Sequence, residues 1–218
     1  RPAPRAFPLG VAYAPLLRQS SGADAGGRGP GRAQVDWEDY NYPPCLRILH
    51  YNLDDVEDAD SRGAVQWAHW SYIGVFGTLA LNLLVNLVLA FGGVAEKGVD
   101  AAFAVFNCVI VGTAGMYSFY HGYKGMATNN MRLSWRYLVI QGAMLVFMLL
   151  SGVLGTANFN GVAGLGRASE AGKLESFWHG SSIAESSLWL ANLLVGGVGF
   201  YKVIVHRQQG RPSILSQL

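Results

Sequence analysis

Four asparagines lie inside stretches that are otherwise almost entirely apolar: Asn82, Asn86, Asn107 and Asn192. Asn82 and Asn86 are four residues apart, which places both on one face of a helix. An amide in hydrocarbon favours a hydrogen bond to another helix, which contributes about 0.6–2 kcal/mol. We therefore interpret these residues as polar contacts between helices, with a transport pathway as the alternative.

Residue types that could support catalysis or bind a metal are present but do not form a pattern. Glu185 lies near the end of an apolar stretch without a second carboxylate at mid-stretch, which gives a proton relay little support. No HExxH, nucleophile-elbow, Walker or dinucleotide-binding glycine motif occurs, and Cys45 and Cys108 match no metal-ligand spacing. The sequence therefore predicts a protein that is not an enzyme and has no catalytic, cofactor or metal site.

Three histidines lie near the ends of apolar stretches: His69, His121 and His179. Each imidazole could ligate a pigment or a haem iron. Their spacing does not place two of them at matching depth, which gives ligation of a pigment or haem little support. We therefore expect bound lipids and no cofactor, with a pigment as the alternative.

The composition separates a polar N-terminal part from an apolar remainder. Of the 218 residues, 51% are hydrophobic and 14% are charged, against about 25% charged in ordinary soluble domains. The first 62 residues hold 16 of the 30 charged residues. The net charge of +2 gives a nucleic-acid partner no support.

Four apolar runs follow residue 64: Tyr72–Val94, Ala101–Tyr123, Tyr137–Ala157 and Ile183–Val205. About 20 apolar residues span a bilayer as a helix, and a helix satisfies its own backbone hydrogen bonds in lipid. The sequence predicts an all-α integral membrane protein. Residues 65–206 would form a four-helix transmembrane bundle, followed by a short basic tail at 207–218.

Basic residues mark one side of the membrane. The connection between the second and third runs holds Lys124, Arg132 and Arg136 and no acid, and Arg207 and Arg211 follow the last run. Basic connections stay on the cytoplasmic or equivalent side. Both termini should therefore share that side, and we expect Lys124, Arg132 and Arg136 to contact lipid headgroups.

The part before the first run has two sections. Residues 1–34 are rich in Gly and Pro and hold five Arg against one acid, a composition that cannot form a core. We expect an extended binding arm that contacts other subunits. Residues 35–64 form an acidic linker, with eight acids between residues 35 and 62.

A short segment of the linker has the character of a membrane-surface element. It comprises Asn41, Tyr42, Pro43, Pro44, Ile48, Leu49 and His50. Pro43 and Pro44 should be extended. Leu46, Ile48, Leu49 and Leu53 would then form an amphipathic stretch lying flat at the interface, with His50 at its polar boundary.

These residues resemble the secretory carrier membrane proteins, whose Asn-aromatic-Pro-Pro motif and Ile-Leu-His segment precede four spans. The matching positions are Asn41–Pro44 and Ile48–His50, followed by Asn82 and Asn86. Phe119–Met126 is similar to the family's aromatic and basic connection, and the resemblance covers about residues 40–205. It implies cytosolic termini, a role in trafficking and membrane fusion, and inositol phospholipid binding at that connection.

Two functional hypotheses follow. The sequence has neither the family's Asn-Pro-Phe repeats nor its charged coiled coil, and its Arg-rich, acid-poor beginning resembles the region next to a transit-peptide cleavage site. We therefore expect a non-enzymatic accessory subunit of a large membrane complex, in the mitochondrial inner membrane or the thylakoid. The alternative is a trafficking protein of post-Golgi and endosomal vesicles.

Overall fold

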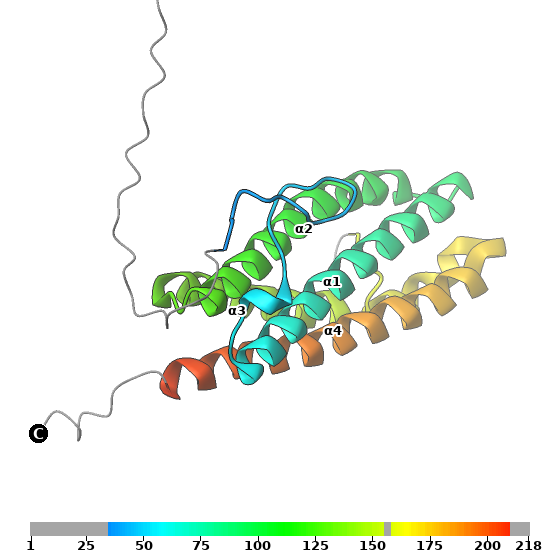
Figure 1. Ribbon diagram of the computed structural model, residues 1–218. Helices are drawn as coiled ribbons and strands as arrows, with labels where there is room; N and C mark the ends of the chain where they lie inside the picture. Colours follow the sequence, from blue (N-terminus) through cyan, green and yellow to red (C-terminus); the bar gives the residue numbers. More distant parts are fainter. Residues whose placement is uncertain (1–34, 155–157, 210–218) are drawn as a thin grey trace, which may run out of the picture. The chain divides into compact units, whose positions relative to one another are not determined.

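A computed structural model describes residues 35–154 and 158–209. In chain order the elements are η1 (Leu53–Asp55), α1 (Ala59–Phe91), α2 (Lys97–Ala127), α3 (Met131–Val153), η2 (Val162–Leu174) and α4 (Glu175–Gln209) (Figure 1). Four of the helices are long and apolar enough to cross a membrane. The prediction of an all-α, four-span membrane protein is confirmed. The expected arm at 1–34 lies outside the described residues.

The four long helices form an antiparallel bundle, with short α1–α2 and α2–α3 connections and a longer α3–α4 connection that contains η2. α1 packs against α2 and α4, and α3 packs against the same two helices. α1 begins, α2 ends, α3 begins and α4 ends at one end of the bundle, which we call the terminal end. The opposite end, which carries the α1–α2 connection and η2, is the distal end.

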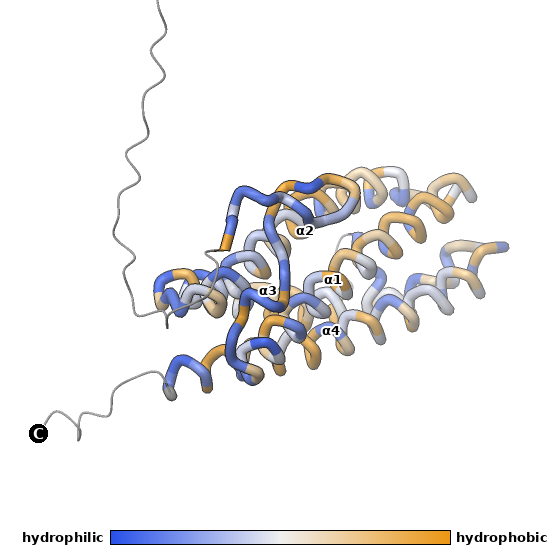
Figure 2. Tube along the Cα trace, viewed as in Figure 1, coloured by the Kyte–Doolittle hydropathy of each residue, from blue (hydrophilic) through white to orange (hydrophobic). Residues whose placement is uncertain are grey.

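The helices are longer than the membrane requires. α1 has 33 residues, a length of roughly 50 Å against about 30 Å of hydrocarbon. α1 therefore extends beyond the predicted span at the terminal end. Figure 2 shows the long apolar helices beside a largely hydrophilic segment that precedes α1.

Local sequence explains where the helices begin and end. The Asp58 carboxylate caps α1 by accepting from the Ser61 amide at 2.8 Å. The Asn130 side chain caps α3 by accepting from two amides of its first turn. Gly93 follows α1 at φ +81°, a conformation that a residue without Cβ adopts at little cost.

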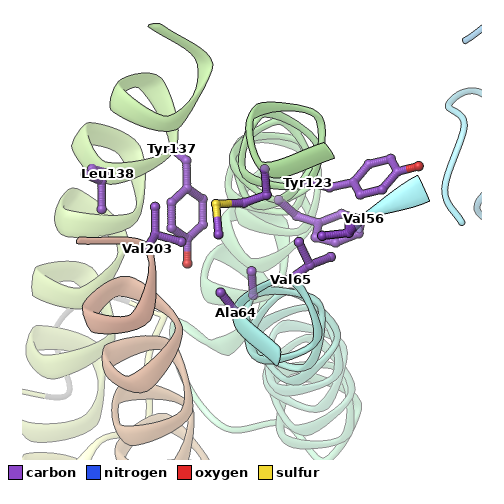
Figure 3. Packing of buried hydrophobic residues seen from close by; sticks show 10 residues of the cluster. Val56, Ala64, Val65, Tyr123, Tyr137, Leu138 and Val203 are labelled. Atoms are coloured by element: carbon purple, nitrogen blue, oxygen red, sulfur yellow. The ribbon is translucent and has the colours of Figure 1, made fainter. Parts of the chain in front are cut away.

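The apolar core has three groups along the bundle. At the terminal end, Val65 of α1, Tyr123 of α2, Tyr137 of α3 and Val203 of α4 pack together with Val56 from the preceding segment (Figure 3). A middle group contains Val75, Leu79, Met144, Met148 and Trp189. A distal group contains Val85, Leu89, Ala168, Ala171 and Trp178.

The distal boundaries of the second and third predicted spans differ from the structure. The third helix ends at Val153, not Ala157, and Asn158 is already buried inside the bundle. The second helix begins at Lys97, four residues before the predicted span, and Lys97 is only 1% exposed. Both differences arise because polar residues at the distal end fold inward.

Candidate functional site

A buried polar network lies between the middle and distal core groups, and Glu185 of α4 is at its centre. Glu185 is fully buried. Its Oε1 accepts from Asn82 Nδ2 at 2.9 Å, from the Asn160 amide at 3.2 Å and from Trp189 Nε1 at 3.4 Å. Its Oε2 accepts from Asn160 Nδ2 at 3.0 Å. A buried carboxylate requires such donors, because burial without them is costly.

Asn158 connects the network to α1 and α2. Its carbonyl oxygen accepts from Asn82 Nδ2 at 2.7 Å and from Asn86 Nδ2 at 2.8 Å. The Asn158 side-chain oxygen accepts from Asn107 Nδ2 at 3.1 Å, and Asn158 Nδ2 donates to Asn82 Oδ1 at 3.2 Å. Three of the four asparagines singled out in the sequence therefore meet at one residue of the α3–η2 connection.

Lys97 supplies the positive charge of the network. Its Nζ donates to Asn86 Oδ1 at 3.1 Å and to Asn160 Oδ1 at 3.0 Å, and it pairs with Asp100 Oδ2 at 3.0 Å. The same ammonium lies 4.4 Å from the ring centroid of Trp178. All three of its protons have acceptors, as a buried lysine requires.

The network joins three helices and a connection through groups that already have partners. Among the described residues, the buried side-chain atoms without a hydrogen bond belong to Ser118, Tyr137 and Ser182, none of which is in the network. A satisfied polar network in a low-dielectric interior makes the packing specific and rigid. The network therefore holds the helices together in one arrangement.

Asn192, the fourth asparagine, lies apart from this network. Its Nδ2 donates to Thr78 Oγ1 at 2.8 Å, linking α4 to α1. A second such link joins Gln141 of α3 to Ser71 of α1 at 3.2 Å.

At the terminal end, residues 36–58 fold back over the bundle; we call this segment the clasp. Asp55 accepts hydrogen bonds from the Tyr123 hydroxyl of α2 and, at 2.7 Å, interacts with His50 Nε2. The Tyr123 oxygen also accepts from the Asn52 amide at 3.1 Å. These contacts fix the clasp to α2 next to the beginning of α1.

Aromatic rings complete the attachment of the clasp. The Tyr42 hydroxyl and His69 Nε2 of α1 are 2.9 Å apart. Tyr51 packs edge-on against Phe119 and Tyr123, with ring centroids about 5 Å apart. Burial, reinforced by Tyr72, Tyr51 and Cys45, raises the pKa of Tyr42 to about 12. Burial also raises the pKa of Tyr51.

The expected shape of the clasp was partly wrong. Pro43 and Pro44 are not extended but begin a tight turn, in which the Pro43 carbonyl accepts from the Leu46 and Arg47 amides. Tyr42 and Leu49 then pair in antiparallel fashion across the turn. The physical reason is that these backbone hydrogen bonds satisfy groups that a flat strand would leave open.

The turn also changes which side chains are buried. Leu49 and His50 are each only 6% exposed, whereas Leu46 is 65% exposed. His50 therefore lies inside the clasp and not at a polar boundary. Asn41 Oδ1 accepts from the Tyr51 amide at 2.9 Å, which closes the base of the turn.

The three basic residues expected at lipid headgroups have different surroundings. Lys124 lies in the last turn of α2, with its Nζ 4.6 Å from the ring centroid of Trp37 in the clasp. Arg132 and Arg136 are exposed at the beginning of α3. Only Thr128–Asn130 separate α2 from α3, so the predicted loop is mostly helix.

The three histidines do not converge. His69 contacts Tyr42, His121 Nδ1 is 2.9 Å from the Tyr117 carbonyl oxygen, and His179 is exposed. In the described part of the chain, no three His, Cys, Asp or Glu residues are grouped as metal ligands.

Sequence reasoning did not find several residues that organise the two sites. Lys97 and Asn160 appeared to be loop residues, and Glu185 appeared to lie near the end of a span. Asp55 and Tyr123 are distant in the chain and carry no motif. Asn158 and Asn160 carry no motif either.

Comparison with known proteins identifies the architecture. No curated protein and no solved structure matches the chain. The SCAMP family model matches residues 39–210, a range that includes nearly all of the clasp, all four long helices and the polar network. Since this match extends over most of the chain and over both sites, the protein belongs to the SCAMP family, the secretory carrier membrane proteins.

Proposed function

We propose that this protein is a non-enzymatic trafficking component of secretory and endosomal membranes. The observation that carries the proposal is the family match over residues 39–210, which contains both the polar network and nearly all of the clasp. The four-helix bundle would serve as a rigid membrane platform, and the clasp would be its surface toward the trafficking machinery.

The rigidity of the platform rests on the distal network. Glu185, Lys97 and Asn158 connect α4, α2 and α1 through the α3–η2 connection. A bundle locked in this way resists rearrangement, which suits a structural component better than a transporter that alternates between two states.

The clasp supplies the polar surface of the terminal end. Acidic residues are concentrated there, and Asp36, Glu38, Asp39, Asp54 and Glu57 are exposed. Basic residues of the same end, including Arg132 and Arg136, favour a cytosolic orientation. In this orientation the clasp faces cytosolic partners.

The accessory-subunit hypothesis makes a different prediction for the same chain. It depends on binding by residues 1–34, which lie outside the described residues. The test is native fractionation of membranes from cells expressing the tagged protein. We expect the protein to sediment with post-Golgi and endosomal vesicles. Migration with a respiratory or photosynthetic complex would contradict the proposal and support the accessory role.

A functional readout completes this test. Depleting the protein should slow delivery of a secreted reporter, and re-expression of the wild-type chain should restore it. A variant with Tyr123→Phe and Asp55→Asn, which loosens the clasp, should restore it less well at equal abundance. Normal secretion after depletion would contradict a trafficking role.

A further inference from the structure

An apolar groove lies between the clasp turn and the outer surfaces of α1 and α2. Pro44, Leu46 and Ile48 form one wall, and Ile73, Phe76 and Val109 are among the helix residues that line the groove. Its volume is about 460 Å³, within the range of about 300–1,000 Å³ that ligand pockets occupy.

The position of the groove indicates what surrounds it. On α2 the groove extends from Cys108 to Met116, a rise of roughly 12 Å. One leaflet of the hydrocarbon core is about 15 Å deep. The groove is therefore nearly as long as one leaflet is deep, which is long enough to follow an acyl chain.

The walls fit a chain of methylene groups. Leu46, Ile48 and Val109 are 65%, 49% and 62% exposed. Exposed apolar side chains around a concave surface mark a site for an apolar partner. Because the helical side of the groove belongs to membrane-spanning segments, its surroundings are lipid rather than water.

An exposed positive charge belongs to the same turn as the apolar wall. Arg47 stands between the two wall residues Leu46 and Ile48 and is exposed. Within residues 35–154 and 158–209, its guanidinium takes part in no hydrogen bond, ion pair or ring contact. Guanidinium binds phosphate through two parallel hydrogen bonds.

We propose that this groove is a binding site for one phospholipid, whose acyl chain fills the groove while Arg47 pairs with its phosphate. The site is separate from the basic residues of the α2–α3 connection. A bound lipid would join the clasp turn to α1 and α2 and would make the attachment of the clasp depend on membrane composition.

Native mass spectrometry of the detergent-purified full chain tests the proposal. Phosphatidylglycerol is added, and diacylglycerol with the same chains serves as the probe without phosphate. We expect the wild-type chain to retain one phosphatidylglycerol and to bind diacylglycerol more weakly. Val109→Trp should fill the groove and abolish retention of both. Ile110→Trp is the matched control, because Ile110 is the next residue, is 64% exposed and does not line the groove.

The headgroup contact has its own pair of variants. Arg47→Gln should lower phosphatidylglycerol retention to the diacylglycerol level, and Arg167→Gln, in η2 at the distal end, should leave it unchanged. If Val109→Trp fails to fold, Thr113→Phe fills the same groove from an exposed position. Equal retention by the groove-filling variant and Ile110→Trp would overturn the site. A retained sterol or a second copy of the chain in place of phospholipid would overturn the assigned occupant.

Discussion

Single side chains in this protein have roles that follow from burial. Glu185 would be costly alone in the bundle, yet donors from α1, α4 and the α3–η2 connection surround it. Removing the carboxylate leaves those donors buried and without a partner, and each such group costs about 1–3 kcal/mol. The structural effect of Glu185 is therefore visible mainly when it is removed.

Replacing Glu185 with Leu should lower the free energy of unfolding by about 3 kcal/mol. Glu185→Gln should be less destabilising than Glu185→Leu, because its side-chain oxygen still accepts hydrogen bonds. Its amide nitrogen faces the Asn160 donor, so that one hydrogen bond is lost. Thermal unfolding in detergent measures both. Glu170→Gln is the control, since Glu170 is exposed and forms an ion pair with Arg167 at 3.8 Å. Equal stability of all variants would show that the network does not hold the bundle.

Tyr42 leads to a prediction about alkaline pH. Its pKa is raised from 10.0 to about 12 by burial, so the folded protein favours the neutral hydroxyl. Its contribution to stability is complete below pH 10 and is lost as the pH rises through about 12. Tyr42→Phe should destabilise the clasp by about 1 kcal/mol at neutral pH, because the contact with His69 is lost.

The same variant should also remove part of the alkaline destabilisation. The measurement is the unfolding midpoint of the wild-type and variant chains from neutral pH to about pH 12. Because Tyr51 also has a raised pKa, the difference between the two curves isolates Tyr42. Parallel curves over the whole range would contradict the assignment.

At the scale of the elements, the beginning of α1 depends on one cap. The Ser61 amide and, next, its hydroxyl donate to Asp58 and lower the pKa of its carboxyl below 3.8. The ionised cap therefore contributes to stability above about pH 3.8, and this contribution is lost as the pH falls through the lowered pKa of Asp58. Asp58→Ala should cost about 1 kcal/mol.

The matched variant Asp58→Asn should keep the cap but remove its pH dependence. Asn accepts the same amide hydrogen bond without titrating. Unfolding measured at neutral pH and below pH 3.8 separates the two effects. If Asn is as destabilising as Ala at neutral pH, the hydrogen bond to Ser61 is not what begins the helix.

Close contact between α2 and α3 depends on Gly125. A Cβ at this position would lie 2.8 Å from the Ser134 backbone nitrogen, which cannot move aside. Gly125→Ala should therefore destabilise the bundle by about 1–3 kcal/mol. Gly180→Ala in α4 meets open space and should stabilise by about 0.5–1 kcal/mol. Unfolding measurements that give the two changes the same sign would refute this packing argument.

The sequence predicts the four helices because length and hydropathy alone determine which segments can cross a membrane. It does not predict the direction in which the distal connection folds. Lys97 lies in a predicted loop but is buried, since Asn86 and Asn160 provide acceptors from other parts of the chain, in addition to the nearby Asp100. The sequence does not predict the fold of the clasp for the same reason. Its Pro-Pro pair is local, whereas the partners Tyr123 and His69 are not.

At the scale of the whole molecule, an even number of antiparallel spans places the clasp and the end of α4 on the same side of the membrane. Residues 36–58 are attached to the terminal end through Tyr123, and α4 ends there at Gln209. The connection that contains η2 is at the opposite end. The described helices therefore define two faces that a membrane-impermeant reagent can distinguish.

Single cysteines in a chain with Cys45→Ser and Cys108→Ala test this arrangement. Glu57→Cys in the clasp and Gln208→Cys near the end of α4 are both at exposed positions of the terminal end, and Lys173→Cys is exposed at the distal end. In sealed vesicles, the first two should react with an impermeant maleimide from one side and the third only from the other. From the basic residues of the terminal end, we propose that this side is the cytosol. Labelling of Glu57→Cys and Gln208→Cys from opposite sides would require an odd number of spans between them, which the four-helix bundle does not allow.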